Sequence, residues 1–373
     1  MKKTTLVFAA LFAASFAMAQ NTATTTQTGN GNGATTNQTG SNTANTEQEG
    51  NGNIASQTQS GSNDASILSV GDGNNATQIQ SGASNVATIS QVGLPSRQDV
   101  TDENTAYQSQ DGERNSASIS QEDKGYGFAS QTQVGNDNTA QIFMRNPWGA
   151  SQPGNSSTQS QTGGDNNEAY ASIFNGSGNT TSQTQIGSDN YSRINQAQGG
   201  NTAIHLQDGD NNYSFSGQSS GGSSASISQI GFDNIATTEQ VGAGNSIIMT
   251  QSGIGNNSGV ISWWQGDRGV SQSGDDNSVV FSQAGEDNTH YVAQTGDGNS
   301  ALVDIDGLGN MGTITQTGDG NSASMSALGN LNEGMILQVG NMNSGSISQT
   351  GNLNVGSITQ MGNSNTASII QGN

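Results

Sequence analysis

Residues of like character alternate along this chain, and the alternation restarts every eleven residues. In the last copy, Asn365, Ala367, Ile369 and Gln371 occupy every second position, and mostly Ser and Thr fill the positions between them. Such a period of two predicts a β-strand with an amide- and alkyl-bearing face and a hydroxyl-bearing face. The residues between successive strands include a Gly, which supplies the positive φ that a tight reversal needs.

The repeat keeps its phase without interruption from Gly274 to Gly362, with Gly at intervals of eleven and Asn three residues after each. Strand, turn, strand and turn make a coil of 22 residues from two 11-residue units. Because the unit length is fixed, successive coils can stack with like residues in register and parallel strand pairing. We therefore predict an all-β protein, a β-solenoid of about fifteen two-strand coils that extends from Asn21 to Gln371, and stacking of the same coils between molecules would give a cross-β assembly.

The inward residue types follow from what a stacked coil must bury. Asn and Gln amides carry donors and acceptors, so each can bond the same residue one coil above and one coil below. An inward Ile or Val contributes about 1.5–3 kcal/mol when fully buried. Two such residues per coil do not offset the cost of ordering the whole coil, about 1–2 kcal/mol per residue. A coil is therefore expected to need neighbours on both sides.

Departures from the repeat are concentrated in the turns. The insertions at 94–102 and 145–154 contain the three prolines of the chain, which predicts loops because proline cannot join a hydrogen-bonded ladder. The stretch around Trp263 fits the repeat least, because it would point Arg268 into the coil.

The N-terminal segment predicts a secreted protein. Residues 1–19 combine Lys2 and Lys3 with an apolar run and a small-residue site ending at Ala19, which is typical of a secretory signal peptide; the alternative is a buried N-terminal helix. We expect a repeat domain at 20–373 and no membrane insertion, because the apolar run is too short to span a bilayer. Cysteine is absent and the net charge is −21, which excludes disulfides and thiolate metal sites and argues against nucleic acid as a partner.

No capping unit is recognisable at either end of the repeat array, so both end coils should expose unpaired backbone groups and amides. An open strand edge pairs with another chain, and a head-to-tail contact that does not close produces a filament. The protein is thus expected to be its own partner; the alternative is a monomeric solenoid. The residues expected to form this self-assembly contact are Asn21, Gln27, Asn32, Gln38, Asn354, Gln360, Asn365 and Gln371.

Acidic residues gather in the turns. Stacked carboxylates repel along the axis, so we hypothesise that they act as gatekeepers that slow premature assembly; a plain solubility surface is the alternative. Calcium binding is a weaker possibility, because the repeat differs in length from the nonapeptide β-roll and lacks its Gly-Gly start. The turn residues in question are Asp137, Asp189, Asp210, Asp233, Asp276, Asp287, Asp297 and Asp319.

The order Gln316, Gly318, Asn321 and Ala323, which recurs from Gln360 to Ala367, resembles the repeat of curlin, the major subunit of curli amyloid fibres. The resemblance covers the predicted repeat domain. It implies export of an unfolded subunit through an outer-membrane secretion pore, polymerisation at the cell surface by a nucleator subunit, and a role in biofilm matrix, adhesion and cell aggregation. The array is longer than in the familiar curlins, and we find no non-repeat secretion segment after the signal peptide.

Catalysis and cofactors are not expected. His205 and His290 are the only histidines, and the repeat points both inward, where a neutral imidazole is the expected state. The competing function is an ice- or surface-binding monomer that uses outward Ser and Thr rows such as Thr22, Thr24 and Thr26. Outward aromatic residues interrupt such rows, and they suit adhesion between fibres or to surfaces.

Overall fold

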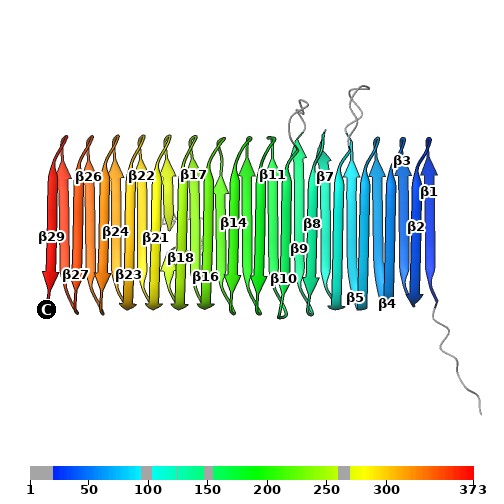
Figure 1. Ribbon diagram of the computed structural model, residues 1–373, viewed down its shortest axis with the longest axis horizontal. Helices are drawn as coiled ribbons and strands as arrows, with labels where there is room; N and C mark the ends of the chain where they lie inside the picture. The colour runs from blue at the N-terminus through cyan, green and yellow to red at the C-terminus, as the bar shows by residue number, and fades with distance from the viewer. Residues whose placement is uncertain (1–19, 94–102, 124, 147–153, 259–268) are drawn as a thin grey trace, which may run out of the picture.

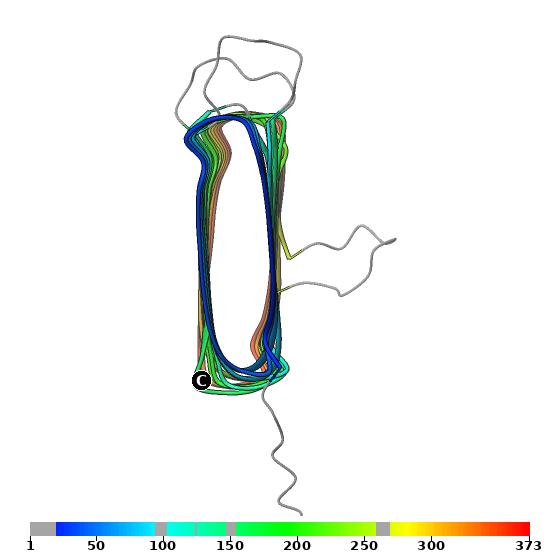
Figure 2. The ribbon, with the colours of Figure 1, turned by 90° about the vertical axis from the view of Figure 1, so that its right-hand side faces the viewer.

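The computed structural model describes residues 20–93, 103–123, 125–146, 154–258 and 269–373. Every regular element in these residues is a β-strand, and the 29 strands form one continuous sheet that winds around an axis (Figure 1). Figure 2 looks along this axis and shows two long, flat sides joined by narrow turns. The predicted β-solenoid is confirmed, with about 15 coils.

The first side of the solenoid starts with β1, and each of its strands pairs with the next in parallel. In stacking order it consists of β1 (Thr22–Thr28), β3 (Thr43–Glu49), the second half of β4 (Ile54–Val70), the second half of β5 (Asn75–Val92), β7 (Ser116–Asp123), β9 (Thr139–Asn146), β11 (Glu168–Phe174), β13 (Tyr191–Ala197), β15 (Tyr213–Gln218), β17 (Ile235–Val241), the split pair β19 (Asn257–Ser258) and β20 (Val270–Ser273), β22 (Thr289–Thr295), β24 (Met311–Thr317), β26 (Glu333–Val339) and β28 (Val355–Met361).

The second side faces the first across the core and is paired in the same way. In stacking order it consists of β2 (Gly33–Gly40), the first half of β4, the first half of β5, β6 (Thr105–Glu113), β8 (Phe128–Val134), β10 (Ser156–Thr162), β12 (Thr180–Ile186), β14 (Thr202–Asp208), β16 (Ser224–Phe232), β18 (Ser246–Ile254), β21 (Ser278–Glu286), β23 (Ser300–Leu308), β25 (Ser322–Leu328), β27 (Ser344–Thr350) and β29 (Thr366–Gly372).

Like residues lie in register from coil to coil. Ile336 of β26 is paired with Ile358 of β28, for example, so that apolar strips run along the axis. Hydrogen-bonded Asn residues are 22 positions apart in the last coils but 21 apart in the first. A segment of 30 positions separates Asn74 from Asn104, yet the strands that follow them remain in register. Insertions therefore lengthen a turn and leave the ladder intact.

Several expectations fall on parts of the chain that the structure does not describe. The signal peptide at 1–19, the prolines of the two insertions, and the stretch around Trp263 and Arg268 lie outside the described residues.

The core holds two apolar clusters with a polar section between them. One cluster runs from Ala55 to Ile173 and the other from Ile227 to Ile358. Between them, the first-side row that holds Ile194 continues with the buried Ser216, while Gln183 and the buried His205 are in register on the second side. This middle section must therefore be held by buried hydrogen bonds, which stabilise only when every partner is satisfied.

Glycine is favoured in most turns for two reasons. Gly318 has a φ of 106°, in the left-handed half of conformational space that disfavours a side chain. A Cβ at this position would also meet the backbone carbonyl of Gly340 one coil further along. The predicted role of the repeated Gly is confirmed, and coil stacking adds the second constraint.

Candidate functional site

Inward Gln residues form ladders that have a direction. Nε2 of Gln316 donates to Oε1 of Gln338 (2.9 Å), and Nε2 of Gln338 donates to Oε1 of Gln360 (2.8 Å). The second Nε2 hydrogen of Gln338 is donated to the carbonyl of Ser322 on the opposite side of the coil (2.9 Å). This cross-coil bond fixes the amide orientation, so every ladder bond is donated toward the C-terminal end.

Inward Asn residues form ladders of the opposite direction. The backbone N–H and Nδ2 of Asn354 both donate to Oδ1 of Asn332 (3.0 Å each). Nδ2 of Asn332 in turn donates to the carbonyl of the turn residue Gly351 (2.9 Å). Donation along the Asn ladders therefore runs toward the N-terminal end.

The Gln ladders break where another residue takes the Gln position. On the first side this happens at Ser69, Met144 and Ile173, and on the second side at Ile305 and Ala327. Gln196, which is in register with Ile173, begins a new run, and its buried Oε1 has no hydrogen-bond partner. An acceptor at the start of a ladder is thus left open, which costs about 1–3 kcal/mol when it is buried.

The N-terminal end coil leaves one edge of each side open. Within the described residues, β1 pairs only with β3 and β2 only with β4. Gln27 donates to Gln48 (2.6 Å) and Gln38 donates to Gln59 (2.8 Å), so the Oε1 atoms of Gln27 and Gln38 are the first acceptors of their ladders. Gln27 is exposed and Gln38 is half-buried.

The Asn residues of this coil present the complementary groups. In the next coil on the first side, the backbone N–H of Asn42 donates to Oδ1 of Asn21 (3.0 Å). By the same repeat, the N–H groups of Asn21 and Asn32 point out of the solenoid. The N-terminal end therefore offers Gln carbonyl oxygens as acceptors and Asn N–H groups as donors.

The C-terminal end coil is open in the reverse sense. Among the described strands, β28 pairs only with β26 and β29 only with β27. Gln360 and Gln371 accept the last ladder bonds, and each donates one amide hydrogen across the coil, Gln371 to the carbonyl of Val355 (2.8 Å). The second amide hydrogens of Gln360 and Gln371 point out of the C-terminal end, in line with the Gln ladders. The Oδ1 atoms of Asn354 and Asn365 point out of the same end, in line with the Asn ladders.

The eight residues expected at the assembly contact thus fall into two groups of four at opposite ends of the rod (Figure 1). If a second copy continued the register, its β1 would follow β28 and its β2 would follow β29. Such stacking places Asn354 on Asn21, Gln360 on Gln27, Asn365 on Asn32 and Gln371 on Gln38. Donors then meet acceptors at all four positions. The sequence shows the residue types but carries no sign of this polarity, which depends on how each amide is turned.

Three of the turn aspartates hold a backbone hydrogen bond. Oδ1 of Asp319 accepts the N–H of Asp297 one coil earlier (3.0 Å), and Oδ1 of Asp297 accepts the N–H of Asp275 (2.9 Å). Asp210 accepts the N–H of Ser188 in the same way (2.7 Å). Asp275, Asp297 and Asp319 therefore place carboxylates of consecutive coils next to one another, as the repulsion hypothesis requires.

The other five turn aspartates lie one position later, with φ between 52° and 57°. Most of them belong to one column, in which Asp189 and Asp233 are separated by Asn211 in the coil between them. Like charges there are two coils apart, about 10 Å at the usual strand spacing, which is close to the Debye length at 0.1 M salt. Repulsion in this column is weaker than stacking at every coil would produce. These five residues are Asp137, Asp189, Asp233, Asp276 and Asp287.

Asp137 is also neutralised by a neighbour. Nε and Nη2 of Arg114 each lie 2.7 Å from a different oxygen of its carboxylate. This hydrogen bonding holds the pKa of Asp137 below its usual value. Asp137 therefore contributes little to any repulsion between coils.

Both histidines point inward, as predicted. Nδ1 of His205 lies 2.9 Å from Oγ of Ser192 and 3.0 Å from Oγ of Ser214, and its Nε2 lies 2.7 Å from Oγ of Ser216. Burial lowers the pKa of His205 and of His290 to about 3. Both imidazoles are neutral at physiological pH and lie out of reach of any external substrate.

The outward rows do not keep one residue type from coil to coil. One row on the first side reads Thr26, Glu47, Leu68 and Ser90 in consecutive coils. A flat, uniformly hydroxylated face, which ice binding would require, does not form along it. Within the described ranges, no three His, Asp or Glu side chains are grouped to hold a metal ion, and no helix is long and apolar enough to cross a membrane.

The parallel coils and the polar ladders define a repeat protein of the β-solenoid class. Comparison with known proteins agrees: a family model described as the curlin-associated repeat matches residues 222–253, 286–318 and 340–372. These three segments are curlin-associated repeats, and the resemblance to the curlin family predicted from the sequence is confirmed for them. This family is structural and not enzymatic. No curated protein matches the chain.

Proposed function

We propose that this protein is the structural subunit of an extracellular, curli-like functional amyloid fibre that assembles head to tail through its end coils. The observation that carries the proposal is the complementarity of the two ends. One end offers Gln acceptors and Asn N–H donors, and the other offers Gln donors and Asn acceptors at the same places in the coil. A β-solenoid without blocking end units is expected to stack on itself.

The polarity of the ladders favours head-to-tail over head-to-head contacts. Two N-terminal ends brought together would set the Oε1 atoms of Gln27 and Gln38 against acceptors of the same kind. Turning the Gln38 amide would relieve this clash, but it would break the bond that its Nε2 donates to the carbonyl of Thr22 (3.2 Å). The head-to-tail contact satisfies every end amide without that loss.

The contact between molecules has less apolar character than the contacts between the C-terminal coils of one molecule. In the stacked arrangement, Ile358 and Ile369 of one copy would meet Thr25 and Thr36 of the next, whereas Ile347 and Ile369 pair within the molecule. Each Thr buries less apolar surface than Ile, and burial stabilises by about 25 cal/mol per Å². The junctions between subunits therefore gain less apolar burial than the contacts between the C-terminal coils, and they resemble the more polar contacts of the first coils, where Thr25 is paired with Thr46.

The cellular setting follows from the family and from the N-terminal sequence. We assign residues 1–19 to a signal peptide and residues 20–373 to the secreted repeat domain. The partners are further copies of the chain, a nucleator subunit and an outer-membrane secretion pore. The fibre serves in biofilm matrix, adhesion and cell aggregation, and the curlin repeats support this role.

Within this proposal the turn aspartates tune the rate of assembly. The adjacent carboxylates of Asp297 and Asp319 contribute most, because they are stacked in consecutive coils. Asp137 contributes least, because Arg114 neutralises it. The sequence predicted the same gatekeeper role for all turn aspartates, whereas the structure divides them into stacked carboxylates with stronger repulsion and others with less.

Electron microscopy and fibre diffraction of the purified protein, left at high concentration and room temperature, test the proposal. The expected result is unbranched filaments with a reflection at about 4.8 Å along the fibre, the spacing between strands. A folded protein that stays dispersed as a monomer for days would reject it.

A further inference from the structure

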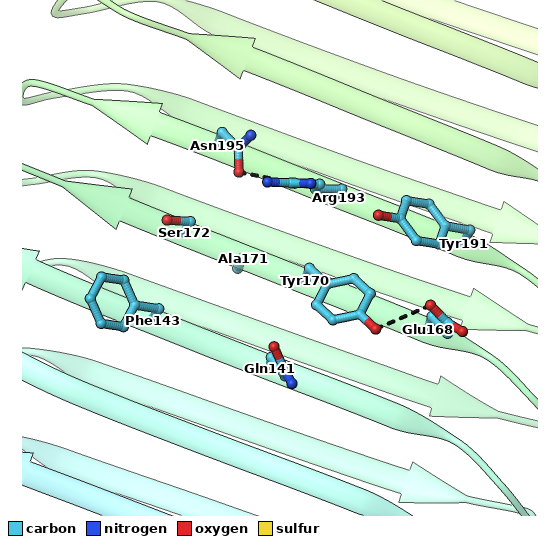
Figure 3. A pocket seen from close by; sticks show the side chains of 9 residues that line it. All are labelled: Gln141, Phe143, Glu168, Tyr170, Ala171, Ser172, Tyr191, Arg193 and Asn195. Carbon is cyan, nitrogen blue, oxygen red and sulfur yellow. Dashed lines mark hydrogen bonds between the residues drawn. The ribbon is translucent and has the colours of Figure 1, made fainter. Parts of the chain in front are cut away.

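A groove lined by aromatic and polar side chains crosses the first side of the solenoid, far from both ends. It encloses about 330 Å³, at the lower end of the range of about 300–1,000 Å³ that small-molecule sites occupy. Three neighbouring strands, β9, β11 and β13, supply its lining (Figure 3).

The groove exists because a small residue lies between larger ones in register. Ser172 of β11 is paired with Phe143 on one side and with Asn195 on the other. Ser172 and the backbone at Ala171 form the floor, while the Phe143 and Tyr170 rings stand on either side of it (Figure 3). The result is a depression one residue wide with an aromatic ring at two of its edges.

The aromatic edge of the groove is held in place by its neighbours. The Tyr170 hydroxyl donates to Oε2 of Glu168 (3.1 Å), and its ring lies 5.7 Å from that of Tyr191. Tyr191 is in turn stacked on Tyr213, with ring centroids 4.9 Å apart and planes within 2°. Rings ordered in this way present a fixed apolar surface with little further entropy to lose on binding.

Planar polar groups complete the lining. Gln141 and Asn195 carry amides with both donors and acceptors, and Ser172 carries a hydroxyl. The Nε of Arg193 donates to Oδ1 of Asn195 (3.3 Å), which orients both side chains over the groove. A ligand in the groove thus meets rings beside its faces and hydrogen-bonding groups along its edges.

We propose that this groove binds a neutral oligosaccharide with flat, equatorially substituted pyranose rings. Such a ring presents C–H groups on its faces, which suit Phe143 and Tyr170, and hydroxyls on its edge, which suit the amides, the serine and the guanidinium. A polyanionic glycan is disfavoured, because Glu168 offsets Arg193 and the chain carries a net charge of −21. A purely aromatic ligand would leave the polar half of the lining without partners.

The site does not depend on assembly. It lies on a side face, whereas stacking between molecules would involve β1, β2, β28 and β29 only. Each copy in a fibre would then carry one such groove, and a polysaccharide strand could engage many copies at once with increased avidity.

Calorimetric titration of the purified protein with cellohexaose tests the proposal, with a galacturonic acid trimer and the dye 8-anilinonaphthalene-1-sulfonate as comparisons. Two variants change the groove in opposite ways: Tyr170→Ala removes a wall, and Ser172→Tyr fills the floor without removing any wall. Tyr107→Ala, which truncates an outward tyrosine on β6, is the matched control. Circular dichroism verifies that each variant keeps its strand content.

We expect saturable binding of cellohexaose that weakens at least tenfold in both groove variants and stays within twofold in Tyr107→Ala. Equal binding by all variants, or no binding of cellohexaose by the unaltered protein, would overturn the proposal. Binding of only the uronic acid trimer or only the dye would overturn it as well, by assigning the groove to another ligand class. Because the titration needs no fibres, failure of the glycan site and failure of assembly are separate outcomes.

Discussion

Proline at two positions of the last coil should block assembly and leave the subunit folded. In the coils before it, outward residues donate their N–H groups to the following coil, as Glu333 does to the carbonyl of Asn354 and Ser344 to that of Asn365 (2.8 Å each). Backbone groups of a parallel strand point to alternate sides, so the N–H groups of Ser357 and Ser368 point out of the C-terminal end. Proline tolerates an edge strand when its nitrogen faces solvent.

The magnitude follows from the bonds that a stacked copy would lose. Each proline leaves one carbonyl of the incoming subunit without a donor, at a cost of about 1–3 kcal/mol. Two prolines therefore weaken the contact by about 2–6 kcal/mol, and each 1.4 kcal/mol is tenfold in an equilibrium constant. The critical concentration for assembly should rise at least about thirtyfold.

The critical concentration is measured as the protein that stays soluble at the plateau of a thioflavin assay, for the double variant Ser357→Pro/Ser368→Pro. The control Ser357→Ala/Ser368→Ala loses the same hydroxyls but keeps both N–H groups, and it should match the unaltered protein. Circular dichroism should show an unchanged strand signal in both. A folded proline variant with the original critical concentration would refute the assignment of the C-terminal edge as a growing contact.

Four further predictions address the ladders, the core and the turns. Gln338→Met keeps the side-chain volume but leaves Oε1 of Gln360 without its donor, so the free energy of unfolding in urea should fall by about 1–3 kcal/mol; no change would mean that the ladder is not stabilising. The pKa of His205 is about 3 in the folded protein, against an ordinary histidine value of 6.5 in the unfolded chain. Between these two pH values the unfolded chain binds more protons than the folded protein. The free energy of unfolding therefore falls as the pH drops below about 6.5, by up to about 1.4 kcal/mol per pH unit. His290 has the same lowered pKa, so His205→Ile, which matches the Ile227 in register with it, should make this slope shallower by the share of one histidine, and an unaltered slope from pH 6 to 4 would contradict the prediction. Gly312→Ala would press a methyl group against the His290 ring and Met325 and should destabilise by about 1–3 kcal/mol in urea, with recovery in Gly312→Ala/His290→Ala; loss without recovery would point to backbone strain instead. Asp297→Asn/Asp319→Asn keeps the backbone hydrogen bonds, as Asn341 and Asn363 do in the same corner, and should shorten the assembly lag by removing charge; an unchanged lag would reject the gatekeeper role.

The strands and their inward residues could be predicted from the sequence because both depend only on local alternation and a fixed unit length. Gln349 and Gln371 illustrate this: they share a phase in the sequence and are hydrogen-bonded in the structure (3.0 Å). The inward positions of both histidines followed from the same phase. Local period and ladder chemistry agree at these positions, as expected for a sequence that specifies one register.

The direction of the ladders could not be predicted, because an amide has the same composition in both orientations. Its orientation is set by the carbonyl opposite, as that of Ser322 sets Gln338. The alternation of Asp189 and Asp233 with Asn211 was missed for a different reason. This alternation becomes visible only when each turn is compared with the turn at the same corner of the next coil, and not with the turn that follows it in the sequence.

The groove is the feature furthest from the reach of the sequence. Phe143 and Ser172 are 29 residues apart, whereas Ser172 and Asn195 are 23 apart, because an insertion lengthens one coil and not the other. Only the ladder register brings these three residues side by side. A fixed spacing of 22 would have aligned different residues and hidden the depression at Ser172.

Disulfide trapping between subunits tests the central claim of head-to-tail stacking most directly. The chain has no cysteine, so cysteines placed at Thr26 in β1 and Thr359 in β28 report without background. Stacking in register would bring these positions onto neighbouring strands, within the Cα separation of about 4.4–6.8 Å that a disulfide needs. We predict that fibres grown from a mixture of Thr26→Cys and Thr359→Cys chains yield mixed disulfide dimers on mild oxidation, whereas fibres of either variant alone yield none. Disulfides that join two Thr359→Cys chains and no mixed dimers would show that the ends meet like to like, and would contradict the account.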